Sequence, residues 1–229
     1  MNLKVHKSKE QIQIFETLQG EGVHSGVPSF FIRLQGCSVN CFFCDEKPTW
    51  KYSPELSQEL NIKDIIERFK VMNSKLKRVV ITGGEPTEQN LVPFIEALIQ
   101  DGYAVAIETA ATGKFLNPIL ELKDTLSNNQ LWVTLSPKEI YSQNGEVSNT
   151  KMWSSADEIK FVFASNKAKD FLLEKITPNL HEVGSQIPVF LVPDWHQRDQ
   201  YQKEILNILK EYPQSYKLGI QAHKFWGLL

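Results

Sequence analysis

The sequence has no long apolar run, and this absence excludes whole classes of protein. No stretch of about 18 apolar residues occurs, so a membrane-spanning helix is not expected. The opening residues, MNLKVHKSKEQ, contain no apolar segment and do not resemble a signal peptide. The net charge is only −2 and the pI is near 6.2, so there is no general electrostatic case for nucleic-acid binding. Internal repeats and low-complexity segments are also absent.

Cysteine is scarce, and the three cysteines present are crowded together. Cys37, Cys41 and Cys44 form the pattern C-x3-C-x2-C. Structural zinc takes four ligands, usually as two pairs, and the chain has no second cysteine pair. Buried structural thiols would be scattered along the chain rather than confined to one loop. Three thiolates can hold three irons of a [4Fe–4S] cluster and leave the fourth iron open, whereas electron-transfer clusters usually have four cysteines. The pattern therefore predicts chemistry at a cluster, and reduced thiols fit the cytoplasm.

The length and composition are typical of one sizeable globular domain, so we expect a single domain over residues 1–229. Short apolar or β-branched runs are typical of buried strands. Seven such runs occur, at residues 29–34, 78–82, 103–108, 131–136, 158–163, 189–192 and 217–221.

Helical periodicity lies between several of these runs. Ile62, Ile65, Ile66 and Phe69 follow Asn61, a favourable N-cap residue. Three more apolar stripes lie near Leu91–Leu98, Phe171–Leu172 and Ile205–Leu209. Strands that alternate with helices favour parallel β-α units, and seven strands are one short of a full barrel. We predict an α/β fold, an incomplete and modified (β/α) barrel of mostly parallel strands.

Unusual polar residues follow the ends of the predicted strands, where β/α barrels build their active sites. They are Gly36-Cys37, Gly83-Gly84-Glu85-Pro86, Glu108-Thr109, Ser136-Pro137-Lys138, Pro193-Asp194, and Gln221 with His223. Loop polarity explains any one of these segments more easily than it explains the whole set. Two glycines allow close backbone approach to a ligand, and Glu85 could accept from a ligand ammonium or close the turn.

Three further features allow a structural or a functional interpretation. The loop Thr17–Gly22 offers Gln19 and Glu21, an amide and a carboxylate that suit an amidine-like ligand edge, although a surface turn is equally compatible. Arg33 lies inside an apolar run and needs either an internal acid or a substrate carboxylate. His223 alone is ambiguous.

The C-x3-C-x2-C motif followed by GGEP resembles the radical S-adenosylmethionine superfamily. The longer series TLQGEG, GVPSFFIRLQGC, CDEKPTW, VITGGEP, IET, SPK, EIK and IQAHK resembles the 7-carboxy-7-deazaguanine synthase family over nearly the whole chain. The resemblance implies a lyase that converts 6-carboxy-5,6,7,8-tetrahydropterin to 7-carboxy-7-deazaguanine with loss of ammonia, in queuosine and 7-deazapurine biosynthesis. It also implies a radical SAM fold, a homodimer, Mg2+, and a flavodoxin- or ferredoxin-type reductant.

The resemblance also implies roles for individual residues. The cluster would be held by the three cysteines, and S-adenosylmethionine by Phe43, Gly83, Gly84, Glu85, Thr109, Ser136 and Lys138. The pterin would be bound by Gln19, Glu21, Arg33, Thr82, His223 and the terminal carboxylate of Leu229.

The chain departs from the family pattern at four points. Glu46 stands where the family has a hydroxyl that helps to bind Mg2+, and we expect the carboxylate to take over that role unless it forms a salt bridge with Lys47 or Lys138. Ala110-Ala111 replaces a segment that contains glycine, Val192 replaces glutamine, and Ala222 replaces threonine. With these changes, a substrate that differs from that of the family is also compatible with the sequence.

Two competing functions stay open on the sequence. A glycyl-radical-enzyme activase is a protein-modifying enzyme of similar size, but the TLQGEG loop and Arg33 favour the pterin enzyme. A non-catalytic electron-transfer protein is disfavoured by the absent fourth cysteine.

Overall fold

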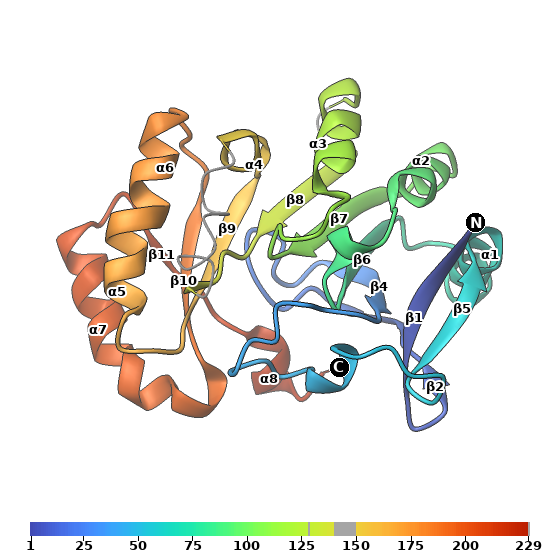
Figure 1. Ribbon diagram of the computed structural model, residues 1–229, viewed down its shortest axis with the longest axis horizontal. Coiled ribbons are helices and arrows are strands. Elements are labelled where there is room, and N and C mark those ends of the chain that lie inside the picture. Colours follow the sequence, from blue (N-terminus) through green and yellow to red (C-terminus); the bar gives the residue numbers. More distant parts are fainter. Residues whose placement is uncertain (128, 140–149, 229) are drawn as a thin grey trace. The chain divides into compact units, whose positions relative to one another are not determined.

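The computed structural model describes residues 1–127, 129–139 and 150–228 (Figure 1). The chain divides into two compact units. The first comprises residues 1–19 and 27–133, and the second comprises residues 20–26 and 134–229. No helix in the described ranges is both long and apolar enough to cross a membrane.

The first unit is built on a mixed sheet. Strand β4 pairs in parallel with β6, and β6 pairs in parallel with β7, while β1, β2, β3 and β5 add antiparallel pairs. The elements are β1 (Asn2–Ser8), β2 (Gln11–Ile12), β3 (Ile14–Leu18), β4 (Pro28–Leu34), η1 (Lys47–Thr49), β5 (Ser57–Asn61), α1 (Ile62–Met72), β6 (Arg78–Gly83), η2 (Pro86–Glu88), α2 (Val92–Gln100), β7 (Ala104–Thr109) and α3 (Leu116–Thr125), followed by the start of β8 (Leu131–Leu135).

The apolar run of β4 is buried because both faces of the strand are covered. Phe30 stacks on Phe69 of α1, with ring centroids 4.7 Å apart. Phe31 faces the other way and packs with Val80, Ala106 and Phe15. A strand covered on both faces needs apolar side chains at successive positions, which explains why SFFIRL does not alternate.

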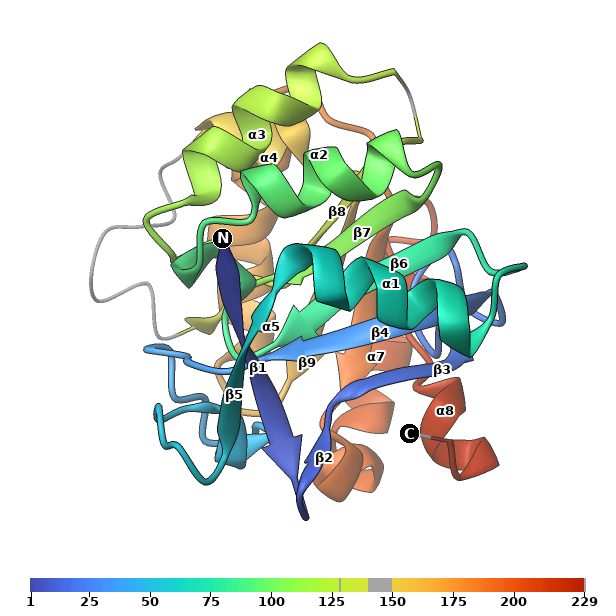
Figure 2. The same cartoon turned by 90° about the vertical axis from the view of Figure 1, so that its right-hand side faces the viewer.

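The helices of this unit bury one apolar stripe each and lie over the sheet (Figure 2). Helix α1 begins as predicted at Asn61, whose side chain accepts a hydrogen bond from the Lys63 backbone N–H at 3.0 Å. This bond satisfies one of the free N–H groups of the first turn.

The second unit has a parallel sheet in which β8 pairs with β9, β9 with β10, and β10 with β11. Its elements are α4 (Thr150–Ser155), β9 (Glu158–Phe163), α5 (Ala168–Phe171), the π-helical turn η5 (Leu172–Ile176), α6 (Thr177–Glu182), β10 (Val189–Pro193), η6 (Trp195–Gln197), α7 (Arg198–Glu211), β11 (Lys217–Leu218) and α8 (Ala222–Trp226). Phe171 of α5 stacks on Phe161 of β9 at 5.6 Å, so this helix covers the sheet.

The predicted fold class is confirmed. All seven predicted strands are present as β4 and β6 to β11, and the strands pair mostly in parallel. In neither unit do the described strands close into a ring. The single domain over residues 1–229 stays a prediction.

Candidate functional site

The three cysteines lie on a loop that follows β4 and is fixed by main-chain hydrogen bonds. The Gly36 N–H donates to the Thr49 carbonyl at 2.7 Å, and the Cys37 N–H donates to the Trp50 carbonyl at 3.0 Å. The Cys44 N–H donates to the Cys41 carbonyl at 3.0 Å, which closes the turn between the last two cysteines. The loop is therefore ordered by its backbone and presents three thiols from eight consecutive residues.

The Cys37 thiol lies in an environment that disfavours its charged form. Burial raises the pKa of Cys37 to about 11, and the negative charge of Glu85 acts in the same direction. Because iron binds the thiolate, metal binding at this position has to displace a firmly held proton.

The Gly83-Gly84 turn is joined to the cysteine loop. The Gly84 N–H donates to the Leu34 carbonyl at 2.8 Å, and the Glu85 N–H donates to the Gly36 carbonyl at 2.7 Å. A Cβ atom at position 84 would lie 2.0 Å from the Gly36 oxygen, so only glycine allows this approach. The two segments singled out in the sequence thus form one backbone assembly.

Glu85 is buried and closes the turn, one of the two roles considered for it. Its carboxylate accepts from the Thr87 N–H at 3.0 Å, from the Thr87 hydroxyl at 2.6 Å, and from the Ala110 N–H at 2.8 Å. The Thr109 hydroxyl donates to the same carboxylate. Burial raises the pKa of Glu85, and the hydrogen bonds from Thr109 and Thr87 oppose that shift. Glu85 therefore fixes the end of β7, where Thr109 lies.

Arg33 and Glu46 form an ion pair near the cysteine loop. Arg33 Nη2 lies 3.6 Å from Glu46 Oε1. The partner of Glu46 is thus Arg33, rather than Lys47 or Lys138 as considered from the sequence. Arg33 Nε is buried and has no hydrogen-bond partner among the described residues.

Two of the predicted substrate residues of the first unit converge on one carboxylate. Gln19 Nε2 donates to Glu108 Oε1 at 2.9 Å, and the Thr82 hydroxyl donates to Glu108 Oε2 at 3.2 Å. Glu108 therefore joins the loop after β3 to the ends of β6 and β7. An amide oriented by a carboxylate in this way presents its oxygen as an acceptor.

In the second unit, Glu21 is held by two polar side chains. Lys160 Nζ lies 2.8 Å from Glu21 Oε2, and Gln221 Nε2 donates to Glu21 Oε1 at 2.9 Å. The loop is anchored again by Glu158, which accepts from the Val23 N–H at 2.7 Å and from the Thr134 hydroxyl at 2.7 Å. The orientation of Glu21 is consequently fixed by β9 and by the residue before α8.

His223 lies in α8 against the same glycine loop. A Cβ atom at Gly20 would lie 2.0 Å from His223 Nδ1, and the Ala222 N–H donates to the Gly20 carbonyl at 2.9 Å. After β8, Lys138 Nζ donates to the Ser136 hydroxyl at 2.6 Å. Leu229 lies outside the described residues.

The structure adds three polar residues that the predicted site lacked, namely Thr87, Glu158 and Lys160, and it gives Glu108, predicted only as a polar residue at a strand end, two side-chain partners. Glu158 and Lys160 are buried in β9. The sequence could have indicated these two residues, because charged side chains at alternating positions of an apolar strand, as in EIKFVF, need internal partners. Phe43 contacts the exposed Phe42 ring edge-on, with centroids 5.1 Å apart.

The described residues contain no group of three or more His, Cys, Asp or Glu side chains arranged to hold one metal ion. This result concerns a single ion and not a multi-iron cluster, whose irons each take one cysteine.

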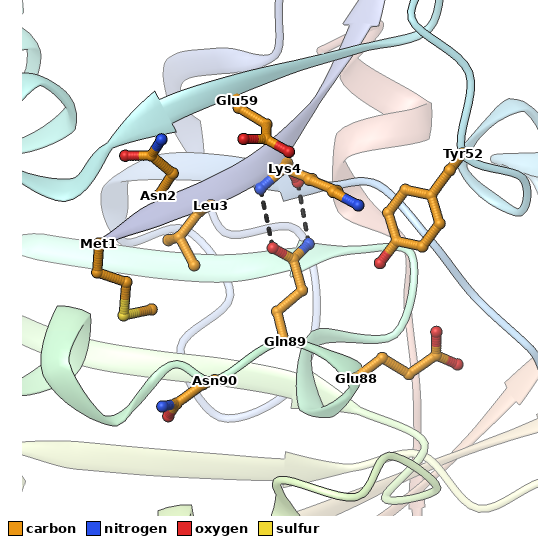
Figure 3. Close-up of a pocket in the computed structure, with 9 residues that line it drawn as sticks. All are labelled: Met1, Asn2, Leu3, Lys4, Tyr52, Glu59, Glu88, Gln89 and Asn90. Atoms are coloured by element: carbon orange, nitrogen blue, oxygen red, sulfur yellow. Dashed lines mark hydrogen bonds between the residues drawn. The ribbon is translucent and has the colours of Figure 1, made fainter.

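A separate cavity of about 350 Å³ lies beside β1 (Figure 3). Its lining residues are Met1, Asn2, Leu3, Lys4, Tyr52, Glu59, Glu88, Gln89 and Asn90. None of them was predicted as a site residue. Glu88 reaches from this cavity to the cysteine loop and accepts from the Ser38 N–H at 2.6 Å.

Residues 31–142 match the model of the radical SAM superfamily. The 7-carboxy-7-deazaguanine synthase of Buchnera aphidicola subsp. Schizaphis graminum is 34% identical, and the match covers 93% of this chain and 95% of that one. The enzyme of the same name from Escherichia coli K12 is 30% identical, with 94% and 97% covered. Among solved structures, QueE from Escherichia coli superposes with a TM-score of 0.73 at 25% identity, over 97% of this chain and 95% of that one.

Proposed function

The chain belongs to the 7-carboxy-7-deazaguanine synthase family of radical SAM enzymes, and on that premise we propose that it converts 6-carboxy-5,6,7,8-tetrahydropterin to 7-carboxy-7-deazaguanine with loss of ammonia. The product lies on the route to queuosine and other 7-deazapurines. An activase or an electron-transfer protein is not favoured, because the relatives that match along almost their whole length are named 7-carboxy-7-deazaguanine synthases.

The observation that carries the proposal is that main-chain hydrogen bonds join the cysteine loop to the Gly83-Gly84 turn. The Glu85 N–H and Gly36 carbonyl join two segments whose sequences match different parts of the radical SAM signature. The residues fit a [4Fe–4S] cluster with one open iron, since three thiols and no fourth occur. When bound, the cluster and S-adenosylmethionine supply one-electron cleavage of the sulfonium and removal of a hydrogen atom from the substrate.

We assign S-adenosylmethionine binding to residues that follow β6, β7 and β8 in the sequence. Gly83 and Gly84 expose backbone amides without a Cβ atom in the way, which suits the polar end of S-adenosylmethionine. Phe43 offers a ring for the adenine. Thr109, Ser136 and Lys138 add polar contacts. We propose that Glu85 acts on the cofactor by fixing Thr109 and Ala110.

Substrate binding is assigned to the polar residues described above. The Gln19 and Glu21 side chains would accept from the amidine edge of the pterin, each held in place by a partner in its own unit. Arg33 would bind the substrate carboxylate, and Thr82 and His223 would line the pocket. Binding of the pterin by the terminal carboxylate of Leu229 stays a prediction.

The residues fit Mg2+ less well than they fit the cluster. Glu46 is a possible hard ligand, but a guanidinium nitrogen lies 3.6 Å from its oxygen. Mg2+ often binds through one or two carboxylates and several waters, and a neighbouring cation opposes it. The role of Glu46 in Mg2+ binding stays a prediction.

We also propose a flavodoxin- or ferredoxin-type reductant, a homodimer and a cytoplasmic location. The cluster chemistry needs one low-potential electron for each activation. These proposals rest on the family.

An anaerobic assay with reconstituted protein tests the function. With reductant, S-adenosylmethionine and the carboxypterin, we expect the deazapurine product and released ammonia. Cys41→Ala should lose cluster absorbance and product together, while Ser38→Ala, in the same loop, should keep both. Cleavage of S-adenosylmethionine without conversion of the pterin would indicate another substrate. Full iron content in Cys41→Ala would refute the cluster assignment.

A further inference from the structure

Arg33 is a charged group whose hydrogen-bonding capacity is only partly used. Its Nε is buried without a partner among the described residues, and its one ion-pair contact, to Glu46, is 3.6 Å long. That distance is beyond hydrogen-bond range for the two atoms. A guanidinium of this kind usually makes two parallel hydrogen bonds to a carboxylate. The contact with Glu46 therefore leaves part of the hydrogen-bonding capacity of Arg33 unused.

Of the two partners, Arg33 is the fixed one. It sits in β4, paired in parallel with Thr82 of β6, and a Cβ atom at Gly83 would lie 2.6 Å from Arg33 Cγ. The stem of the arginine thus runs closely over Gly83. Glu46 lies on the loop before η1, and its side chain is 37% exposed. Glu46 can turn into solvent, whereas Arg33 cannot follow it.

We infer that Glu46 is the resting counterion of Arg33 and that the substrate carboxylate displaces it. This inference rests on the proposed function, in which Arg33 binds that carboxylate. One carboxylate replaces another, so the buried guanidinium is never left unpaired, which would be costly. The incoming group gains two short hydrogen bonds, and Glu46 regains full hydration. Glu46 consequently lowers the affinity for carboxylated ligands and does not change the affinity for pterins without a carboxylate.

Glu46→Gln should change the affinity for a carboxylated ligand in opposite directions, depending on whether Glu46 competes for Arg33 or binds Mg2+. If Glu46 competes for Arg33, Glu46→Gln strengthens the binding of a carboxylated ligand. If Glu46 holds a metal that assists binding, the same change weakens it. A half-exposed ion pair is worth up to about 1 kcal/mol, so the expected gain is about three- to fivefold in Kd.

The experiment measures binding of 6-carboxypterin and of pterin, which lacks the carboxylate, by fluorescence titration of the anaerobic, cluster-loaded protein. The binding of either ligand can be measured without catalytic turnover. We expect Glu46→Gln to bind 6-carboxypterin about three- to fivefold more tightly, with pterin unchanged. Glu55→Gln removes one exposed negative charge from the same segment and should alter neither affinity. Iron content verifies that each variant is folded and loaded.

The outcomes separate this inference from the proposed function. Unchanged or weaker 6-carboxypterin binding in Glu46→Gln overturns the inference, and so does an equal gain for both ligands. Mn2+ gives a second readout by its paramagnetic resonance: Mn2+ held by the wild type and lost in Glu46→Gln overturns the inference in favour of a metal site. If neither pterin binds any of the proteins, the proposed function fails and the inference fails with it.

Discussion

At the scale of single residues, Ala111 carries backbone strain at a position where the family has glycine nearby. Its φ is +63°, in the left-handed region that costs a residue with a Cβ about 1–2 kcal/mol. The Ala111 N–H is nevertheless used, because it donates to the Thr109 hydroxyl at 2.7 Å. The strain is therefore maintained by the turn that places Thr109.

Ala111→Gly should stabilise the protein. Glycine removes the strain and loses about 0.4–1 kcal/mol through the greater entropy of the unfolded chain, which leaves a net gain of about 0.5–1 kcal/mol. Urea unfolding of protein in one fixed cluster state measures the change. Ala110→Gly, at a neighbour without a positive φ, should destabilise by about 0.5–1 kcal/mol. Equal effects of the two substitutions would mean that the strain at position 111 has no energetic weight.

Glu85→Gln should destabilise the protein by about 1–3 kcal/mol, because the two N–H donors of an amide face the donors that surround Glu85, and the carboxyl group carries fewer donors whether protonated or ionised. The pH dependence has a definite sign. The pKa of Glu85 is raised in the folded protein above its ordinary 4.5, so the contribution of this group is full below pH 4.5 and declines as the pH rises toward the folded pKa.

The stability gap between wild type and Glu85→Gln should therefore be widest near pH 4.5 and narrow at higher pH. Unfolding midpoints measured from pH 4.5 to 8 test this expectation. Glu96→Gln, on the exposed side of α2, serves as the control and should give only a small gap. A Glu85→Gln gap that widens with pH would show that the pKa is lowered instead.

At the scale of elements, the glycine loop and α8 depend on each other. Gly20→Ala would place a methyl group where His223 Nδ1 now lies, so the histidine ring would have to leave. We expect the KM for the carboxypterin to rise about tenfold, the loss of one or two polar contacts, while iron content stays unchanged. Gly26→Ala serves as the control for backbone strain in the loop, because the φ of Gly26 is +88° and no atom lies within 4 Å of its added Cβ. A similar rise in both variants would place the effect in loop strain rather than in His223.

The elements also show what the sequence could and could not predict. The buried parallel strands were predictable because apolar residues are continuous in them, as in RVVIT. Strand β1 was missed because Leu3 and Val5 alternate with polar residues, the pattern of a half-buried antiparallel strand. Helix α3 was missed although Leu116, Ile119 and Leu120 have helical spacing.

Within the site, residue types were predictable and side-chain partners were not. The sequence indicated that Arg33 needs a partner and that Glu85 could close its turn, and the structure has both contacts. It indicated no protein partner for Glu21, which Lys160 holds. The partners in the structure are Lys160, Glu46 and Thr109. They could not be predicted, because strand register decides which of several polar residues comes within reach.

At the scale of the whole molecule, cluster binding should stabilise the two units unequally. The cysteines belong to the first unit, and so do Gly84 and Glu85, whose N–H groups donate to the Leu34 and Gly36 carbonyls just before the cysteine loop. A ligand stabilises the state that binds it. We expect anaerobic reconstitution to increase hydrogen-exchange protection mainly in residues 35–52 and 83–89, as measured by mass spectrometry. Cys41→Ala should show no increase, and equal protection in residues 150–228 would contradict this local effect.

Gln89 has a consequence for the behaviour of the chain in concentrated solution. Its side-chain amide accepts from the Lys4 N–H at 2.9 Å and donates to the Lys4 carbonyl at 3.0 Å, as a neighbouring strand would (Figure 3). Unpaired groups on a strand are templates for pairing with other chains. β1 and β4 pair at Val5 and Leu34, where β4 ends, so one glutamine supplies the partner of the Lys4 N–H that β4 does not reach, and this N–H is not left open as a template for another chain.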